Sequence, residues 1–155
     1  MRRLLPWLLV AACAPISART MMPNPARTTD QVSARQSYEI GPYRDDHRYE
    51  VTFAGWKPDR LRFAVHLVNL DPCGRPDAYV FTLVDDHDRT YAWQPARSAT
   101  TRQLAGHAGA TLTDSEVEGE FPAPVGPTTR FVTFRVRPVN GGACSALDFR
   151  WDFRG

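Results

Sequence analysis

Two short segments combine carboxylates with an imidazole, the residue types that bind metal ions or transfer protons. Asp45-Asp46-His47 and Asp85-Asp86-His87-Asp88 repeat the same triplet. Carboxylate oxygens suit Ca²⁺, and a mixture of carboxylate and imidazole ligands suits Zn²⁺. Aspartate also favours solvated turns, because its side chain accepts hydrogen bonds from nearby backbone amides. A metal site and two structural turns are therefore both open interpretations.

The other histidines are not part of a recognisable catalytic motif. His66 falls on the polar face of an expected strand, where we expect it to form a hydrogen bond across a sheet. His107 falls in a glycine-containing segment without a nearby carboxylate. The sequence has no nucleophile elbow, Cys/His dyad, phosphate-binding glycine loop or zinc-protease motif. We expect no catalysis and no cofactor; convergence of His66, His107 and an Asp in one cleft would indicate an enzyme.

The charge balance argues against a nucleic-acid partner. The chain has 19 Lys and Arg and 17 Asp and Glu, for a net charge of +2. Two of the basic residues, Arg2 and Arg3, belong to a segment that we expect to be removed, which leaves a neutral protein. A neutral domain lacks the basic surface typical of nucleic-acid-binding proteins.

Residues 1–12 have the organisation of a secretory signal peptide. Arg2 and Arg3 precede an apolar run from Leu4 to Ala12. This run is shorter than the roughly 20 residues that a membrane-spanning helix needs. We therefore expect export from the cytoplasm.

Val10-Ala11-Ala12-Cys13 resembles the bacterial lipobox, in which a peptidase cleaves before a lipid-modified cysteine. The resemblance implies that Cys13 becomes the first residue of a lipoprotein and anchors it to a membrane. An aspartate after the cysteine would favour the inner membrane; Ala14 at this position indicates the outer membrane. The alternative is an ordinary signal peptide with a coincidental cysteine.

Residues 13–42 are predicted to be a flexible linker. Large apolar residues are few, and Pro15, Pro23 and Pro25 interrupt any continuous helix. The folded domain is expected to occupy residues 43–155.

The alternation of apolar and polar residues over this range predicts an all-β domain. Leu112, Val117 and Phe121 indicate edge-like strands in the middle of the chain, and Trp93 is expected against the core rather than on a carbohydrate-binding surface. With turn signals between segments and no helical period, we predict a single antiparallel immunoglobulin-like β-sandwich of seven to eight strands. The clearest alternation falls at residues 49–53, 61–67, 79–83, 132–136 and 147–153, with a shorter stretch at 90–94.

The last two strands can be given a register. Asn140-Gly141-Gly142-Ala143 suits a tight turn. A hairpin around it places Phe134 opposite Phe149 and Val132 opposite Trp151 on the inner face. Arg135 then meets Asp148 on the outer face.

With Cys13 carrying lipid, Cys73 and Cys144 are left as an even pair in an oxidising compartment. We expect a disulfide bond, which would stabilise the fold by roughly 4 kcal/mol because it closes a long loop. A redox or metal pair is the alternative, although the Cys-x-x-Cys spacing is absent.

The whole pattern resembles the telokin-like, immunoglobulin-type domains of bacterial surface lipoproteins. The resemblance rests on the lipobox, the polar spacer, the strand Leu61–Leu70 and the aromatic strand with its acidic turn at Tyr79–Asp88. Many members of such families have no assigned activity. Asn69–Pro76 is also similar to a segment of the small outer-membrane lipoprotein of type VI secretion systems, although the strands expected after it do not fit.

We therefore expect a lipid-anchored module of the cell envelope that contacts a partner protein. Sandwiches of this kind bind through loops at their ends. The candidate contact segments are Asp71–Asp77, Asp85–Asp88 and Thr100–Ala110. The alternative is an envelope protein that binds Ca²⁺ or Zn²⁺ through the two Asp-Asp-His segments.

Overall fold

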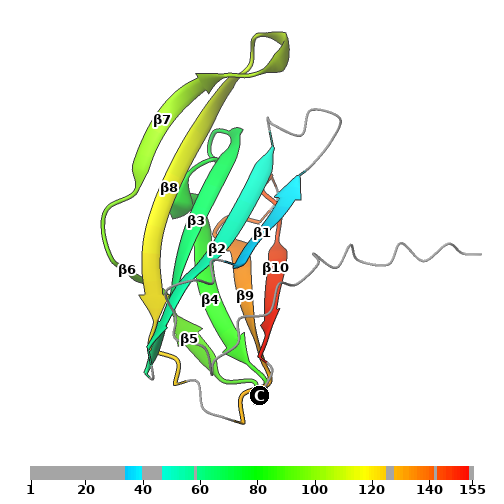
Figure 1. Ribbon diagram of the computed structural model, residues 1–155. Helices are drawn as coiled ribbons and strands as arrows, with labels where there is room; N and C mark the ends of the chain where they lie inside the picture. Colours follow the sequence, from blue (N-terminus) through cyan, green and yellow to red (C-terminus); the bar gives the residue numbers. More distant parts are fainter. Residues whose placement is uncertain (1–33, 40–46, 58, 125–127, 142, 154–155) are drawn as a thin grey trace, which may run out of the picture.

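The computed structural model describes residues 34–39, 47–57, 59–124, 128–141 and 143–153. These residues form two antiparallel sheets packed as a sandwich (Figure 1), which confirms the predicted all-β, immunoglobulin-like fold. No helix in the described ranges is long and apolar enough to cross a membrane.

The larger sheet has the strand order β1-β2-β3-β8-β6, and β7 pairs with β8 farther along the same edge. The smaller sheet has the order β10-β9-β4-β5. Two single-turn 3-10 helices, η2 (Pro76–Ala78) and η3 (His107–Gly109), lie in the connections. The strands are β1 (Ala34–Glu39), β2 (Arg48–Lys57), β3 (Arg60–Leu70), β4 (Tyr79–Asp85), β5 (Thr90–Ala92), β6 (Gln94–Pro95), β7 (Thr100–Ala105), β8 (Thr111–Phe121), β9 (Phe131–Pro138) and β10 (Leu147–Asp152).

The core lies between the sheets and consists of alternate residues of each long strand. Phe63 is at its centre and is completely buried. Its ring lies 5.1 to 5.8 Å, between centroids, from four other aromatic rings in edge-on contacts, a geometry that aromatic pairs favour. Those rings belong to Phe53, Phe121, Phe134 and Trp151.

The predicted hairpin of β9 and β10 is confirmed in register. Phe134 pairs with Phe149, and Val132 pairs with Trp151. All four side chains are buried. Arg135 opposes Asp148 on the outer face, where Arg137 makes the shorter contact to the same carboxylate.

Strand β1 corrects the linker prediction, which is wrong for Ala34–Glu39. Its sequence is mostly polar, so no apolar alternation marks it. The strand is held by main-chain pairing with β2 and by the buried side chain of Gln36, which donates to the carbonyl of Arg150 at 2.6 Å. The sandwich therefore begins before residue 43.

The middle of the chain also differs from the prediction. β8 is a single central strand of 11 residues instead of several edge strands, because its buried residues Thr113, Asp114 and Ser115 are polar and hide the alternation. Most of the predicted loop Thr100–Ala110 is strand β7, whose residues are all exposed. The β7–β8 hairpin rises beyond the neighbouring strands (Figure 1).

The chain passes from the smaller sheet to the larger one at Trp93. Ala92 pairs with Thr82 of β4, and Gln94 pairs with Glu120 of β8. The indole between them packs against Phe81, Phe121 and Phe134 at centroid distances of 5.3 to 5.8 Å, so Trp93 lies against the core as predicted. Gly119 makes this possible, because a Cβ at this position would lie 2.4 Å from the indole.

Replacing Gly119 by alanine should push Trp93 out of place. We expect Gly119→Ala to lower the free energy of unfolding by about 1–3 kcal/mol, the usual cost of overpacking a core. Gly141→Ala is the matched control, since no atom lies within 4 Å of its Cβ position. Urea unfolding followed by tryptophan fluorescence measures both; equal midpoints for the two variants would contradict the proposed fit.

Candidate functional site

The acidic turn Asp85–Arg89 is organised around one carboxylate. Oδ1 of Asp85 accepts hydrogen bonds from the backbone amides of His87 (2.9 Å) and Arg89 (3.0 Å). Oδ2 accepts from Nε of Arg89 (2.7 Å) and from the hydroxyl of Tyr91 (2.9 Å). Burial raises the pKa of Asp85, but these hydrogen bonds outweigh it and hold the pKa below its ordinary value.

Asp86 connects the same turn to the segment that precedes β9. Its side chain is 1% exposed, and Oδ2 accepts from the backbone amide of Arg130 at 3.0 Å. Oδ1 lies 3.1 Å from Nδ1 of His87 without hydrogen-bond geometry. Burial raises the pKa of Asp86, and the Arg130 amide and the neighbouring His87 more than offset that effect.

Donor atoms of Asp85, Asp86 and His87 lie within 4.8 Å of one another, close enough to be considered for a metal ion. The four acceptor positions of Asp85 are, however, already used within the protein. Oδ1 of Asp86 and the ring of His87 remain, whereas Zn²⁺ takes about four ligands and Ca²⁺ about six to eight. Asp88 is exposed and adopts the positive φ of 61° that closes the turn. The contacts are those of a structural turn, and metal binding here stays a prediction.

His47, the described residue of the first Asp-Asp-His segment, does not meet the acidic turn. Nδ1 of His47 lies 2.7 Å from Oδ1 of Asn69, at the end of β3. This is the end of the sandwich where β4 begins, whereas Asp85 ends β4 about 20 Å farther along the strand. Asp45 and Asp46 lie outside the described residues. His47 and the acidic turn are therefore not parts of one site.

The end of the sandwich near His47 carries the predicted disulfide, and we call it the disulfide end. It comprises residues 70–78, 106–110, 139–141 and 143–144. Cys73 and Cys144 are bonded across 71 residues of chain, which confirms the predicted pair. The bond joins the connection after β3 to the turn between β9 and β10.

A buried chain of hydrogen-bonded polar groups ends at the carbonyl of Cys73. Nδ2 of Asn69 donates to the hydroxyl of Tyr49 at 2.8 Å, and the hydroxyls of Tyr49 and Tyr79 are 3.1 Å apart. The hydroxyl of Tyr79 donates to the carbonyl of Cys73 at 3.0 Å. Burial raises the pKa of Tyr79, so this phenol stays protonated as a donor. Gly74 then fits tightly against β8, because a Cβ there would lie 2.2 Å from the carbonyl of Thr113.

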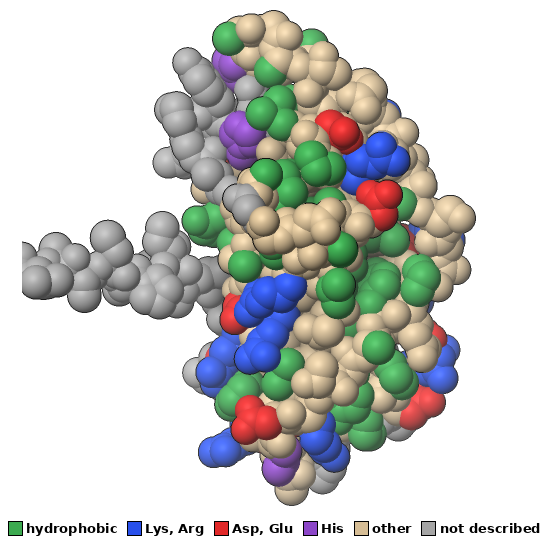
Figure 2. Space-filling model, turned by 180° about the vertical axis from the view of Figure 1, so that it is seen from behind, with side chains coloured by type: hydrophobic (Ala, Val, Ile, Leu, Met, Phe, Trp, Pro, Cys, Tyr) green, Lys and Arg blue, Asp and Glu red, His purple; other side chains and the backbone are tan. Residues whose placement is uncertain are grey.

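The exposed large hydrophobic residues of the described chain lie at or near the strand ends that face the disulfide end, Leu70 and Leu104 on the outer face of the larger sheet and Val80 on the outer face of the smaller one. These are Leu70 (44% exposed), Val80 (51%), Leu104 (36%) and Val139 (55%). Leu70 and Leu104 lie on either side of Leu112 in adjacent strands. The amide of Val139 donates to the carbonyl of Ala78, which lies two residues before Val80. Figure 2 shows that hydrophobic side chains are spread over both halves of the face seen there, among polar and charged ones.

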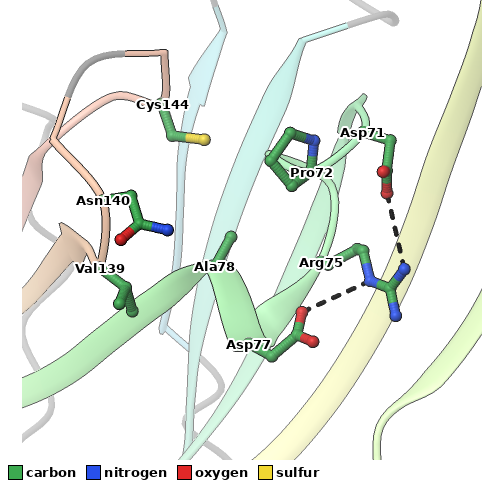
Figure 3. Close-up of a pocket in the computed structure, with 8 residues that line it drawn as sticks. All are labelled: Asp71, Pro72, Arg75, Asp77, Ala78, Val139, Asn140 and Cys144. Atoms are coloured by element: carbon green, nitrogen blue, oxygen red, sulfur yellow. Dashed lines mark ion pairs between the residues drawn. The ribbon is translucent and has the colours of Figure 1, made fainter.

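A shallow hollow of about 360 Å³ opens beside the disulfide (Figure 3). Arg75 lies across it between two carboxylates, 3.8 Å from Asp71 and 3.4 Å from Asp77. Val139, Asn140 and Cys144 form the opposite wall (Figure 3). Of the three predicted contact segments, Asp71–Asp77 and the tip of Thr100–Ala110 therefore lie at this end, and Asp85–Asp88 lies at the other.

His66 forms the predicted hydrogen bond across the larger sheet. Its Nε2 lies 2.7 Å from Oδ1 of Asp114, and Nε of Arg102 lies 2.7 Å from the other oxygen of that carboxylate. His107 is at the tip of the β7–β8 hairpin. Five residues of β8, about 17 Å, separate the position opposite His66 from the hairpin tip, so the two histidines do not share a cleft.

Sequence reasoning missed the exposed end residues, since single apolar residues at strand ends carry no periodic signal. No protein-family model matches the chain, and neither a curated protein nor a solved structure matches it significantly. The fold and this surface together define an antiparallel β-sandwich with one rigid, partly apolar end.

Removing the charge of Asp85 should weaken the acidic turn and change the acid sensitivity of the protein. We expect Asp85→Asn to cost about 1–3 kcal/mol at pH 7, because donors in the turn lose a charged acceptor. A carboxylate whose pKa is lowered in the folded state stabilises the fold at pH values above its ordinary pKa of 3.8. This stabilisation is lost as the pH falls below that value.

The free energy of unfolding of Asp85→Asn should therefore approach that of the natural protein below about pH 4. Asp88→Asn is the control, because Asp88 is exposed and asparagine tolerates its positive φ. Urea unfolding between pH 3 and pH 7, in steps of about half a unit, tests this; a constant difference at every pH would contradict it.

Proposed function

We propose that the protein is a lipid-anchored module of the cell envelope that binds another envelope protein with its disulfide end and catalyses no reaction. The observation that carries the proposal is that all four exposed large hydrophobic residues of the described chain lie near this one end, Leu70 beside Leu104 on the larger sheet and Val80 near Val139 on the smaller sheet. Exposed apolar residues that cluster are typical of protein contact surfaces, whereas scattered ones need no explanation.

The disulfide end is also built to keep its shape. The disulfide, the buried Asn69–Tyr49–Tyr79 chain and the close contact of Gly74 with Thr113 fix the loop 71–78 against β8 and β9. A surface that is ordered before binding loses less conformational entropy when a partner docks. Rigidity and exposed apolar groups together suit a protein partner.

Anchoring and location rest on the sequence. The signal peptide and the lipobox at Val10–Cys13 support lipid attachment at Cys13, which lies outside the described residues. A disulfide-bonded fold suits an oxidising compartment outside the cytoplasm. Ala14 supports the outer membrane as the place of attachment.

Cys13→Ser should release the protein from membranes, because one change removes every acyl chain at about 0.8 kcal/mol for each buried methylene. Fractionation of cells and mass spectrometry of the mature chain measure this. Cys73→Ser with Cys144→Ser is the control that keeps the anchor. The proposed lipid anchor would be refuted if Cys13→Ser stayed attached to membranes and the natural protein carried no acyl mass.

Introducing charged side chains at the disulfide end should abolish binding of the partner protein. We expect Val139→Asp combined with Leu104→Asp to reduce at least tenfold the recovery of a stoichiometric envelope protein after purification in mild detergent, since aspartate in an apolar contact is desolvated without a counter-ion. Ala54→Asp, an exposed site in the half of β2 away from this end, should leave recovery unchanged. Absence of a stoichiometric partner, or equal recovery with all variants, would reject the proposed function.

A further inference from the structure

Strand β7 is an outermost strand of the larger sheet, and its far side is open. It pairs with β8 along its whole length, from Thr100 opposite Glu116 to Ala105 opposite Thr111. Within the described chain no strand pairs with its other side, and Figure 1 shows β7 at the margin of the sheet with no segment beyond it. All six of its residues are exposed, so solvent reaches both faces of the strand. β7 is therefore a free sheet edge.

The hydrogen bonding of the β7–β8 hairpin shows which main-chain groups face this open side. Gly106 donates its amide to the carbonyl of Ala110 at 2.8 Å, and the two residues continue the register of β7 with β8. In an antiparallel pair, residues whose amide and carbonyl point to the neighbouring strand alternate with residues whose groups point away from it. The even-numbered residues of β7 therefore bond to β8. Thr101, Gln103 and Ala105 direct their amides and carbonyls to the open side.

The other sheet edges carry features that discourage pairing with a further strand. β5 has three residues, and β6 has two, one of which is Pro95. β10 is charged at three of its six positions, and Gln36 of β1 ties the edge of β1 to it by donating to the carbonyl of Arg150. β7 has one charge, Arg102, whose Nε is held on Asp114 of β8 at 2.7 Å, within the sheet. The edge of β7 is left without such a feature.

The sequence of β7 is complementary to itself when two copies run antiparallel about Gln103. In this register the outward groups of Gln103 pair with those of Gln103 in the second copy, and Thr101 pairs with Ala105 on either side. The three pairs form about six main-chain hydrogen bonds. On the outer face Leu104 lies opposite Arg102 of the second copy, so no like charges meet.

Other registers are less favourable. An axis at Arg102 places two guanidinium groups directly opposite each other, and like charges in that position destabilise a sheet. An axis at Leu104 leaves two hydrogen-bonded pairs within the strands, because Ala105 is the last residue of β7. The axis at Gln103 forms more pairs than either and opposes no charges.

We propose that two copies of the protein pair along β7, antiparallel about Gln103, so that their larger sheets become one continuous sheet. The copies are then related by a two-fold axis, the commonest symmetry of protein dimers. The exposed main-chain groups supply the affinity, and the symmetric register selects a second copy over an unrelated strand. The pairing does not rest on the proposed envelope partner, and it uses neither Val139 nor the loop 71–78.

A cysteine on the two-fold axis tests the register. The Cα atoms of the two Gln103 residues should lie about 5.5 Å apart, a separation that a disulfide bridges. We expect Gln103→Cys to give a disulfide-linked chain of doubled mass when intact cells are analysed on a non-reducing gel. Thr101→Cys is the matched control, because its two copies would lie about 14 Å apart and should stay unlinked.

Removing one outward amide tests the hydrogen bonds. Gln103→Pro loses the amide at a position on a sheet edge where proline is tolerated, and Gln103→Ala loses the same side chain but keeps the amide. In sedimentation of the full chain in mild detergent, Gln103→Ala should form dimers, and Gln103→Pro should need at least tenfold more protein to do so. Val139→Asp with Leu104→Asp should still pair, because the new carboxylate on β7 lies opposite Arg102.

The pairing is overturned if Gln103→Cys forms no linked dimer, if it links only to a different protein, or if Thr101→Cys links equally well. Equal self-association of Gln103→Pro and Gln103→Ala also overturns it. The two cysteine variants decide alone if Gln103→Pro does not fold. Because these measurements need no envelope partner, their outcome is separate from that of the proposed function.

Discussion

The passage of the chain from one sheet to the other at Trp93 is the constraint on which this sandwich depends. Its indole closes the open side of the core against Phe81 and Phe121, and the fit requires that Gly119 has no side chain. The same turn ends β5 after three residues and brings Trp93 beside Phe81 of β4. One packing interaction therefore completes the core and carries the chain from one sheet to the other.

The two ends of the sandwich hold their loops with different chemistry. At one end a buried carboxylate, Asp85, collects four hydrogen bonds and fixes a turn that is otherwise exposed. At the other end a disulfide and a line of neutral hydroxyl and amide groups fix Cys73 and its neighbours. The carboxylates of the acidic turn are engaged within the protein, whereas the disulfide end leaves apolar side chains exposed, and this difference favours the disulfide end as the contact surface.

The proposed mode of binding follows from these features. A disulfide end that keeps its shape offers a partner exposed apolar side chains in fixed positions. The proposed lipid anchor on Cys13 would hold this surface close to partners in the envelope.

The amino-acid sequence by itself determined the elements whose burial is periodic. Alternation defined β2, β3, β4, β9 and β10, the register of the last hairpin and, with the expected compartment, the disulfide. Alternation could not indicate β1, or that β8 is one continuous strand. The reason is that tertiary contacts bury polar residues there, namely Gln36, Thr113, Asp114 and Ser115. The tertiary structure likewise decided the distance between His47 and the acidic turn and the exposed apolar residues near the disulfide end. Each depends on which strand ends meet in space, and local periodicity carries no information about that.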